Sequence, residues 1–422
     1  TDMENEDHVA IEFEAMLEKA QPLFSMESCC IYKVPHEIRQ TNEDAYTPML
    51  ISIGPLHHGR NPRLLKMESQ KQVYCRDFIE ISEASLSNLM SCVRDLEPEI
   101  RICYSEKIGL TEDEFMKMIL VDCAFVIELF LRDYEGTTEG HVIFSQPWMS
   151  DRIIDDLSLL ENQIPLFVFD KIYNLAFASR LSNGDGFPSF MLLAVNYFSY
   201  ENKQGFLPPA ASSILHFTDL LRYLYLPPSD RMSSRNSQKL VLGHSASELV
   251  EAGVKFQVSK SSHGILDLEF KGSILKIPHL SVQDNTEVLL RNIVALEQCY
   301  YPEEHYIIDY VRFLTQLVNS NKDADVLIKA GIIETMVSGN DTSVAKLFSD
   351  VWKNITVTGV NDDYLQICND LNAYYKHPWH TKIATLRRDY FTTPWKTAAS
   401  IAGIALVIFT IIQTVCSILQ VK

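Results

Sequence analysis

Five acidic side chains stand in apolar stretches of the sequence, where a carboxyl group can serve as a general acid or base. A pair of carboxylates working on one helix would be three or four residues apart. Asp122 and Glu128 are six positions apart, and Asp156 and Glu161 are five apart, so neither pair shares a helix face closely. The fifth acid is Glu297. An acid–base site near Asp156 and Glu161, of hydrolase or transferase type, is therefore kept only as the alternative interpretation.

A partial nucleophile elbow occurs at Gly243-His244-Ser245-Ala246-Ser247. The elbow of α/β-hydrolases needs a second glycine at the fifth position and a strand in front of it, and neither is evident here. Ser245 is followed three positions later by Glu248, which is the pattern of a helix capping box. We therefore interpret Ser245 as a helix cap. No phosphate-binding loop or dinucleotide-binding glycine motif occurs in the sequence.

Histidine and cysteine spacings do not favour a metal site. His57 and His58 are adjacent, and neighbouring side chains diverge in regular structure, so one ion would need ligands from elsewhere. His377 and His380 have helical spacing, but Pro378 lies between them. The nine cysteines follow no C-x-x-C pattern and sit mostly in apolar stretches, which is the usage of a reducing compartment. The sequence predicts no catalytic residue, no cofactor and no bound metal.

Polar residues interrupt the apolar stretch LSLLENQIPLFVFD, residues 157–170. Pro165 cannot donate an amide proton and clashes with the carbonyl of Glu161, so a helix here must kink or restart. Each buried backbone group left unpaired costs roughly 1–3 kcal/mol. Asn162 and Gln163 carry donors and acceptors that can satisfy such groups. A similar polar group occurs later in the chain: Asn292, Glu297 and Gln298. We interpret both groups as a structural polar joint that fixes how helices cross, in preference to a catalytic site.

Hydrophobic periodicity predicts a mainly α fold with a small antiparallel β element. The stretch from Thr111 to Gly136 starts with a capping box, Thr111 and Glu114, and is apolar nearly all round, so we expect a central buried helix. Alternating residues over 254–282 predict the β ribbon. The expected organisation is an acidic segment at 1–24, a helical half at 25–226, a linker loop at 227–240, a second half at 241–390 with the ribbon and helices, and a transmembrane helix at 397–419.

The expected transmembrane helix rests on residues 397–419, TAASIAGIALVIFTIIQTVCSIL, which contain no charged residue. A helix of this length spans roughly 35 Å, enough for a hydrocarbon core of roughly 30 Å. Residues expected at the membrane interface precede it: Arg387, Arg388, Trp395 and Lys396. Because the positive charges lie on the N-terminal side, we predict a tail-anchored, single-pass protein at the plasma membrane with a cytosolic domain.

Two further features bear on this prediction. Small residues form a stripe on one helical face that would let two anchors approach closely and the chain form a homo-oligomer: Ala399, Gly403, Thr410, Thr414 and Ser417. Against a cytosolic domain, residues 340–342 and 354–356 are formal N-glycosylation sequons, which are usable only in a luminal domain. We give more weight to the charge asymmetry.

The formal net charge of -18 limits the class of partners. Such a chain repels phosphate backbones, and its Lys and Arg residues are dispersed, so nucleic acid is not expected as a partner. The expected partners are membrane lipid, through 397–419, and a protein that the sequence does not specify.

The chain resembles the plant domain-of-unknown-function family numbered 247. The resemblance spans roughly residues 29–419 in the family's order and rests on stretches such as LKMESQK, DDLSLLENQIPLFVF, ASELVEAGVKF and LLRNIVALEQ. One departure is Asp122-Cys123-Ala124-Phe125, where a glycine often precedes the cysteine. The resemblance implies a plant-restricted, membrane-attached protein without an assigned activity, and some members are associated with pollen–pistil self-recognition in grasses. It implies no catalytic residue. We therefore expect a membrane-anchored interaction or signalling module.

Overall fold

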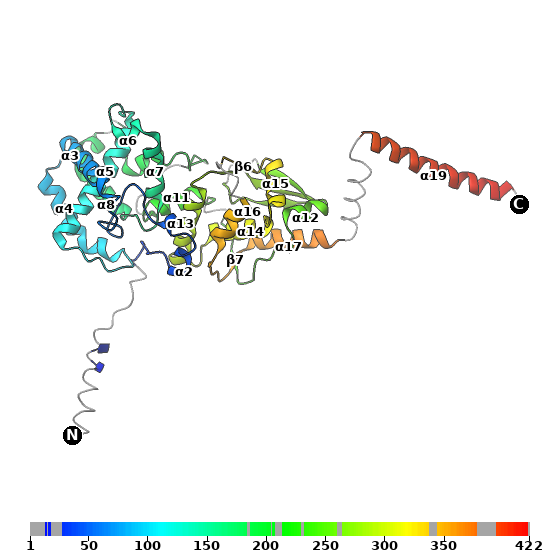
Figure 1. Ribbon diagram of the computed structural model, residues 1–422, viewed down its shortest axis with the longest axis horizontal. Helices are drawn as coiled ribbons and strands as arrows, with labels where there is room; N and C mark the ends of the chain where they lie inside the picture. Colours follow the sequence, from blue (N-terminus) through cyan, green and yellow to red (C-terminus); the bar gives the residue numbers. More distant parts are fainter. Residues whose placement is uncertain are drawn as a thin grey trace, which may run out of the picture. The chain divides into compact units, whose positions relative to one another are not determined.

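The computed structural model describes residues 13–14, 16–17, 28–183, 186–203, 205–206, 213–228, 232–259, 264–336, 344–377 and 394–420. Most of the predicted acidic segment at 1–24 lies outside this part of the chain. The chain divides into two compact units (Figure 1). Unit 1 comprises Thr1–Leu226, Asn285–Ile307 and Lys353–Thr356, and unit 2 comprises Pro227–Asp284, Ile308–Trp352 and Val357–Lys422.

Unit 1 is helical and is built around the long helix α5, which packs against α3, α4, α8 and α10. Its elements are α2 (His36–Arg39), the 3-10 helix η1 (Glu43–Tyr46), α3 (Leu65–Ile81), α4 (Leu86–Ile102), α5 (Glu112–Glu135), α6 (Val142–Ser145), α7 (Pro147–Ser158), α8 (Leu166–Ala176), α9 (Ala178–Ser182), α10 (Phe190–Tyr197), α11 (Phe217–Tyr225) and α13 (Thr286–Cys299).

The predicted bounds of the central helix are confirmed. Thr111 and Glu114 form the capping box of α5, and Gly136 ends the helix in the left-handed conformation, with φ of 69°. An uninterrupted run of residues between Asp122 and Arg132 is buried, because other helices surround α5. Near its C-terminal end Phe130 stacks on the ring of Tyr197, which forms an aromatic part of the core.

The predicted interruption at Pro165 is also confirmed. Helix α7 ends at Ser158, and α8 begins at Leu166 with Pro165 as its N-cap residue. The five residues between Leu159 and Gln163 are not helical, and all five are buried. Their backbone groups therefore need partners outside helical hydrogen bonding.

In its described residues, unit 2 combines helices with three small sheets. Its elements are β1 (Arg235–Asn236), α12 (Ala246–Glu251), β2 (Lys255–Ser259), β3 (Glu269–Lys271), β4 (Ile274–Pro278), β5 (Leu280–Val282), most of α14 (Tyr306–Leu317), α15 (Asn321–Lys329), β6 (Ile333–Thr335), α16 (Val344–Trp352), β7 (Val360–Asn361), α17 (Asp362–Lys376) and α19 (Pro394–Gln420). The strand orders are β1-β7, β2-β4-β3 and β5-β6.

The β element is mixed, whereas the sequence predicted an antiparallel ribbon. Strand β4 pairs antiparallel with β3 across a tight turn at Gly272, but it pairs parallel with β2, and β5 pairs parallel with β6. The alternation of residues identified the strands, but it does not depend on strand direction, so the parallel pairings were missed.

No helix within the described residues combines the length and the apolar character needed to cross a membrane. The predicted transmembrane helix at 397–419 is therefore wrong, and so are the tail anchor and the single-pass plasma-membrane location derived from it. Residues 394–420 form helix α19.

The residues linked to that prediction are only partly described. Arg387 and Arg388 lie outside the described residues, as do the side chains of Trp395, Lys396, Ala399 and Ser417. The remaining members of the small-residue stripe are Gly403, Thr410 and Thr414. They lie on α19, where the two threonine hydroxyl groups donate to backbone carbonyls one turn earlier.

Candidate functional site

The side chains of Asn162 and Gln163 are hydrogen-bonded entirely to backbone groups of unit 1. The Asn162 Oδ1 accepts from the Ile53 amide at 2.8 Å, and its Nδ2 donates to the carbonyls of Ile51 and Asp156. The Gln163 Nε2 donates to the carbonyls of Leu157, in the last turn of α7, and Leu159, just after it, and its Oε1 accepts from the amide of Phe217. Both residues thus pair the backbone groups that the end of α7 leaves open.

Asp156, in the last turn of α7, holds the segment before Ile53 in the same way. Its carboxylate accepts from the amides of Met49, Leu50 and Ile51 at 2.7–2.9 Å. Burial raises the pKa of Asp156 to about 6, against the opposing effect of these three donors. All of its hydrogen bonds go to backbone, so the residue acts as an anchor for a loop.

Asp122 and Lys71 form a buried ion pair next to that loop. The Lys71 Nζ contacts Asp122 Oδ1 at 2.5 Å and donates to the carbonyl of Ser52, while Asp122 Oδ2 accepts from the Gly54 amide. Burial alone would lower the pKa of Lys71, but the carboxylates of Asp122 and Glu68 raise it. Lys71 therefore stays charged, and the pair fixes the loop by its hydrogen bonds.

Glu161 connects three segments of unit 1. Its Oε1 accepts from the amide of Val34 at 2.9 Å and pairs with Arg39 at 2.8 Å, and its Oε2 lies 3.1 Å from His57 Nε2. Burial by itself would raise the pKa of Glu161, but His57, Arg39 and the Val34 amide together lower it. Glu161 therefore remains ionised and holds helix α2 from the inside.

The second polar group of the joint lies on α13. Asn292 accepts from the amide of Leu160 at 2.9 Å and donates to the carbonyl of Ala45, so it ties α13 to the α7–α8 connection. Glu297 pairs with Arg222 of α11 at 2.9 Å. Unlike these two, Gln298 faces a pocket on the surface of unit 1, described below.

His216 is a buried member of this network that the sequence analysis did not identify. Its Nε2 lies 3.1 Å from the carbonyl of Cys30, and its Nδ1 accepts from the amide of Asp219 at the start of α11. These partners assign the proton to Nε2. Burial lowers the pKa of His216 to about 4, so the ring is neutral at pH 7.

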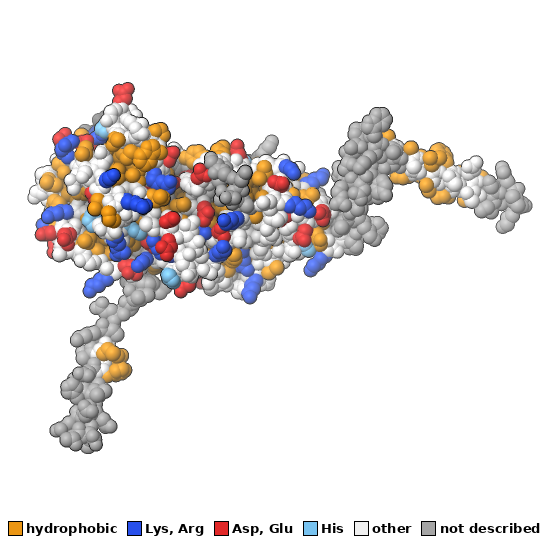
Figure 2. All heavy atoms as spheres, in the orientation of Figure 1, with side chains coloured by type: hydrophobic (Ala, Val, Ile, Leu, Met, Phe, Trp, Pro, Cys, Tyr) orange, Lys and Arg blue, Asp and Glu red, His pale blue; other side chains and the backbone are white. Residues whose placement is uncertain are grey.

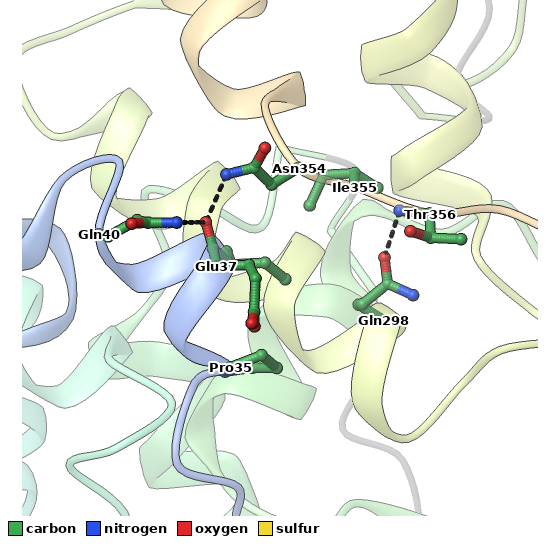
Figure 3. Close-up of a pocket in the computed structure, with 8 residues that line it drawn as sticks. Pro35, Glu37, Gln40, Gln298, Asn354, Ile355 and Thr356 are labelled. Atoms are coloured by element: carbon green, nitrogen blue, oxygen red, sulfur yellow. Dashed lines mark hydrogen bonds between the residues drawn. The ribbon is translucent and has the colours of Figure 1, made fainter.

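A pocket of about 490 Å³ lies on the outer side of α2 (Figure 3). Three segments form it: the turn around α2, the end of α13, and residues 354–356. The Asn354 Nδ2 and Gln40 Nε2 both donate to the carbonyl of Glu37, and the Thr356 amide donates to Gln298 Oε1 at 2.8 Å. The lining residues are Pro35, Glu37, Ile38, Gln40, Gln298, Asn354, Ile355 and Thr356.

The joint and the pocket share the same supports. Helix α2 is held on its inner side by Glu161 and presents Glu37 and Gln40 to the pocket on its outer side. On α13, Asn292 binds the joint, while Gln298 lines the pocket. Among the residues that line the pocket, the sequence analysis named only Gln298, as part of the polar joint, and residues 354–356, as a glycosylation sequon. Neither assignment predicted a pocket.

The other candidates for chemistry do not converge within the described residues. No group of three or more His, Cys, Asp or Glu side chains there could hold a metal ion. Ser245 forms the predicted capping box with Glu248. His380 and the first sequon, residues 340–342, lie outside the described residues.

The chain is similar over most of its length to plant proteins. A family model described as a plant protein of unknown function, DUF247, matches residues 31–409. The chain is 30% identical to the UPF0481 protein At3g47200 of Arabidopsis thaliana, over 93% of this chain and 87% of that protein. It is 22% identical to the putative UPF0481 protein At3g02645 of the same plant, over 91% of this chain and 89% of that protein. No solved structure matches the chain.

Proposed function

Because the chain belongs to DUF247, a family of plant proteins of unknown function, we propose that it acts as a protein-interaction module. In this proposal its buried polar residues maintain the shape of unit 1 and perform no reaction. The observation that carries it is the bonding of Asp156, Asn162, Gln163 and Asn292, whose described partners are backbone amides and carbonyls.

The distribution of these bonds supports the proposal. A general acid or base must reach the substrate proton by a direct hydrogen bond or through one water. Each carboxylate oxygen of Asp156 already accepts from at least one amide inside the core. The loop at residues 47–54 and helix α2 are instead placed rigidly, which is the requirement for presenting a binding surface.

The proposal is tested with the full-length chain, tagged at its natural expression level in plant tissue and purified after reversible chemical cross-linking. We expect a protein cross-linked in near-stoichiometric amount, and expect the purified pair to reassociate with a measurable Kd. Links between two copies of the chain would identify a homo-oligomer as the assembly. A chain that is recovered alone, and that does not bind any cross-linked candidate after purification, would contradict the proposal.

One observation favours the alternative, an enzyme of hydrolase or transferase type. The Glu161 carboxylate lies 3.1 Å from Nε2 of the partly exposed His57, and a carboxylate beside an imidazole provides two of the three members of a catalytic triad. Among the described residues, no Ser, Thr or Cys is hydrogen-bonded to the other ring nitrogen of His57, where the nucleophile of a triad would lie. Turnover of an ester or amide substrate library by the purified chain, abolished by His57→Asn, would establish the alternative. Equal signals from both proteins would exclude it.

A further inference from the structure

The surface pocket beside α2 has hydrogen-bonding groups that the fold does not use. The Gln298 Oε1 accepts a hydrogen bond from the Thr356 amide. Gln40 and Asn354 donate from their side-chain nitrogens to the Glu37 carbonyl, and no described residue uses their side-chain oxygens. Within the described residues, Gln298 Nε2, Gln40 Oε1 and Asn354 Oδ1 thus have no hydrogen-bond partner. One donor and two acceptors at a pocket rim match the alternating N–H and C=O groups of an extended peptide.

The walls of the pocket are fixed by packing against the core of unit 1. Ile38 is buried, and Ile355 packs against the same core cluster, so both walls are anchored in the core of unit 1. Asn354 has a φ of 62°, a left-handed backbone conformation that costs energy in most residues and gathers at functional sites. A rigid wall lowers the entropy that binding must offset.

The charge of the pocket selects the ligand. Glu37 is the one charged residue among the eight that line it, and its side chain is exposed. The whole chain carries a net charge of -18, which attracts cationic partners over a distance. Pro35, Ile38 and Ile355 supply apolar area against which the aliphatic stem of a Lys or Arg can lie.

The same residues argue against a carbohydrate. Sugar rings usually stack on an aromatic face, and none of the eight lining residues is aromatic. Phosphate-bearing ligands are disfavoured because the lining has a carboxylate and no cation.

We propose that this pocket binds an extended segment of a partner protein, with the segment's Lys or Arg side chain paired to Glu37 and its backbone bonded to Gln40, Gln298 and Asn354. This inference rests on the proposed function as an interaction module and names the place and the chemistry of the interaction.

The test selects binders from a displayed library of random dodecapeptides on the full-length chain. The enriched peptides are then synthesised and their Kd values are measured for the chain and three variants. Glu37→Gln removes the charge, and Asn354→Gly removes the amide while relieving the backbone strain. Glu43→Gln is the matched control, because it removes an exposed carboxylate of η1 outside the pocket. Thermal unfolding of each variant checks that it is folded.

We expect enriched peptides to contain Lys or Arg and to bind Glu37→Gln about five- to ten-fold more weakly, since a partly exposed charge pair is lost. Asn354→Gly is expected to weaken binding, Glu43→Gln to leave it unchanged, and added salt to weaken it for the parent chain more than for Glu37→Gln. Equal binding to all variants, a lack of enriched peptides, or a glycan array signal lost in Glu37→Gln would each overturn the pocket proposal. The cross-linking experiment decides the interaction module separately, because it does not depend on where the partner binds.

Discussion

Asn162 shows at the scale of a single residue how the buried polar groups of unit 1 are used. Its side chain makes three hydrogen bonds, all to backbone, and connects the loop at residues 51–53 to the last turn of α7. Glu161 has a different role, because it adds charged partners, Arg39 and His57. Substitutions of these residues should therefore reduce stability, since each removes partners from buried groups.

Glu161→Gln is expected to lower the free energy of unfolding by about 2–4 kcal/mol. The variant keeps the shape of the side chain, but one carboxylate oxygen becomes an N–H donor facing Arg39 and Val34 or His57. Urea unfolding followed by circular dichroism measures the change, with Glu43→Gln as the exposed control. An unchanged midpoint together with loss of an enzymatic turnover would favour the alternative function.

The close approach at Gly54 gives a second prediction at this scale. Gly54 has a φ of 73°, and a Cβ atom there would lie 2.3 Å from the carbonyl oxygen of Gln163. We expect Gly54→Ala to lower the free energy of unfolding by about 2–4 kcal/mol. The added Cβ forces the neighbouring backbone to move, and alanine is also strained at this positive φ. Gly59→Ala is the matched control, since its φ is 68° but its Cβ meets nothing within 4 Å. Equal unfolding free energies of the two variants would contradict the clash.

His216 makes stability depend on pH. The folded pKa of His216 is about 4, below its usual 6.5, so only the unfolded state takes up a proton between these values. The neutral His216 therefore contributes fully to the free energy of unfolding above pH 6.5. As the pH falls from 6.5 to 4, this contribution is lost, and the free energy of unfolding decreases by about 3 kcal/mol in total. The buried Asp156 acts with the opposite sign, because its raised pKa of about 6 makes the folded state take up a proton as the pH falls below 6.

The two contributions are separated by comparing the parent chain with His216→Asn, which retains an N-cap acceptor for α11. The difference in unfolding free energy between the two proteins should shrink as the pH is lowered from 7 to 4, since Asp156 is common to both. A difference that stays constant across this range would show that His216 does not titrate as expected.

At the scale of elements, local rules located helix ends well. The capping boxes at Thr111 and Ser245 and the restart of the helix at Pro165 all follow from side-chain and backbone hydrogen-bonding rules that act within four residues. Strand pairing depends instead on segments far apart in the chain. The parallel partner of β4, strand β2, lies on the other side of the intervening β3 in sequence, and periodicity alone did not reveal it.

The capping box of α5 should contribute measurably to stability. Thr111 accepts from the Glu114 amide, while Glu114 accepts from the Thr111 amide at 3.0 Å. Thr111→Ala removes the first bond, and we expect a loss of about 1 kcal/mol in the unfolding free energy. Thr111→Ser keeps the hydroxyl group and should lose less than half as much. The same loss in both variants would show that the methyl group matters and the hydroxyl does not.

At the scale of the whole molecule, charge is the dominant feature. Acidic and basic side chains are interspersed on the face shown in Figure 2, and the total is -18. The net negative charge is consistent with the proposed cationic partner segment. The predicted membrane attachment failed at this scale, because no described helix meets the requirements of a span.

The net charge also predicts the response to nucleic acid. We expect a fluorescently labelled DNA duplex or RNA of ~20 base pairs to show no anisotropy change with the full-length chain, even at about 50 mM salt, where phosphate contacts are strongest. Binding that weakens steeply as salt is added would reveal a basic surface and would contradict this expectation.

Composition, helix caps and proline were sufficient to determine a mainly helical chain with its main breaks, because these signals act between near neighbours. They also pointed to buried amides and acids that must bond to backbone, although not to their partners. Only the tertiary structure decided that Glu161 holds α2 and that Gln298 meets residues 35–40 and 354–356 in a pocket. Contacts between Glu37 and Asn354 join positions more than three hundred residues apart, and such pairings depend on how the helices pack, which local sequence does not specify.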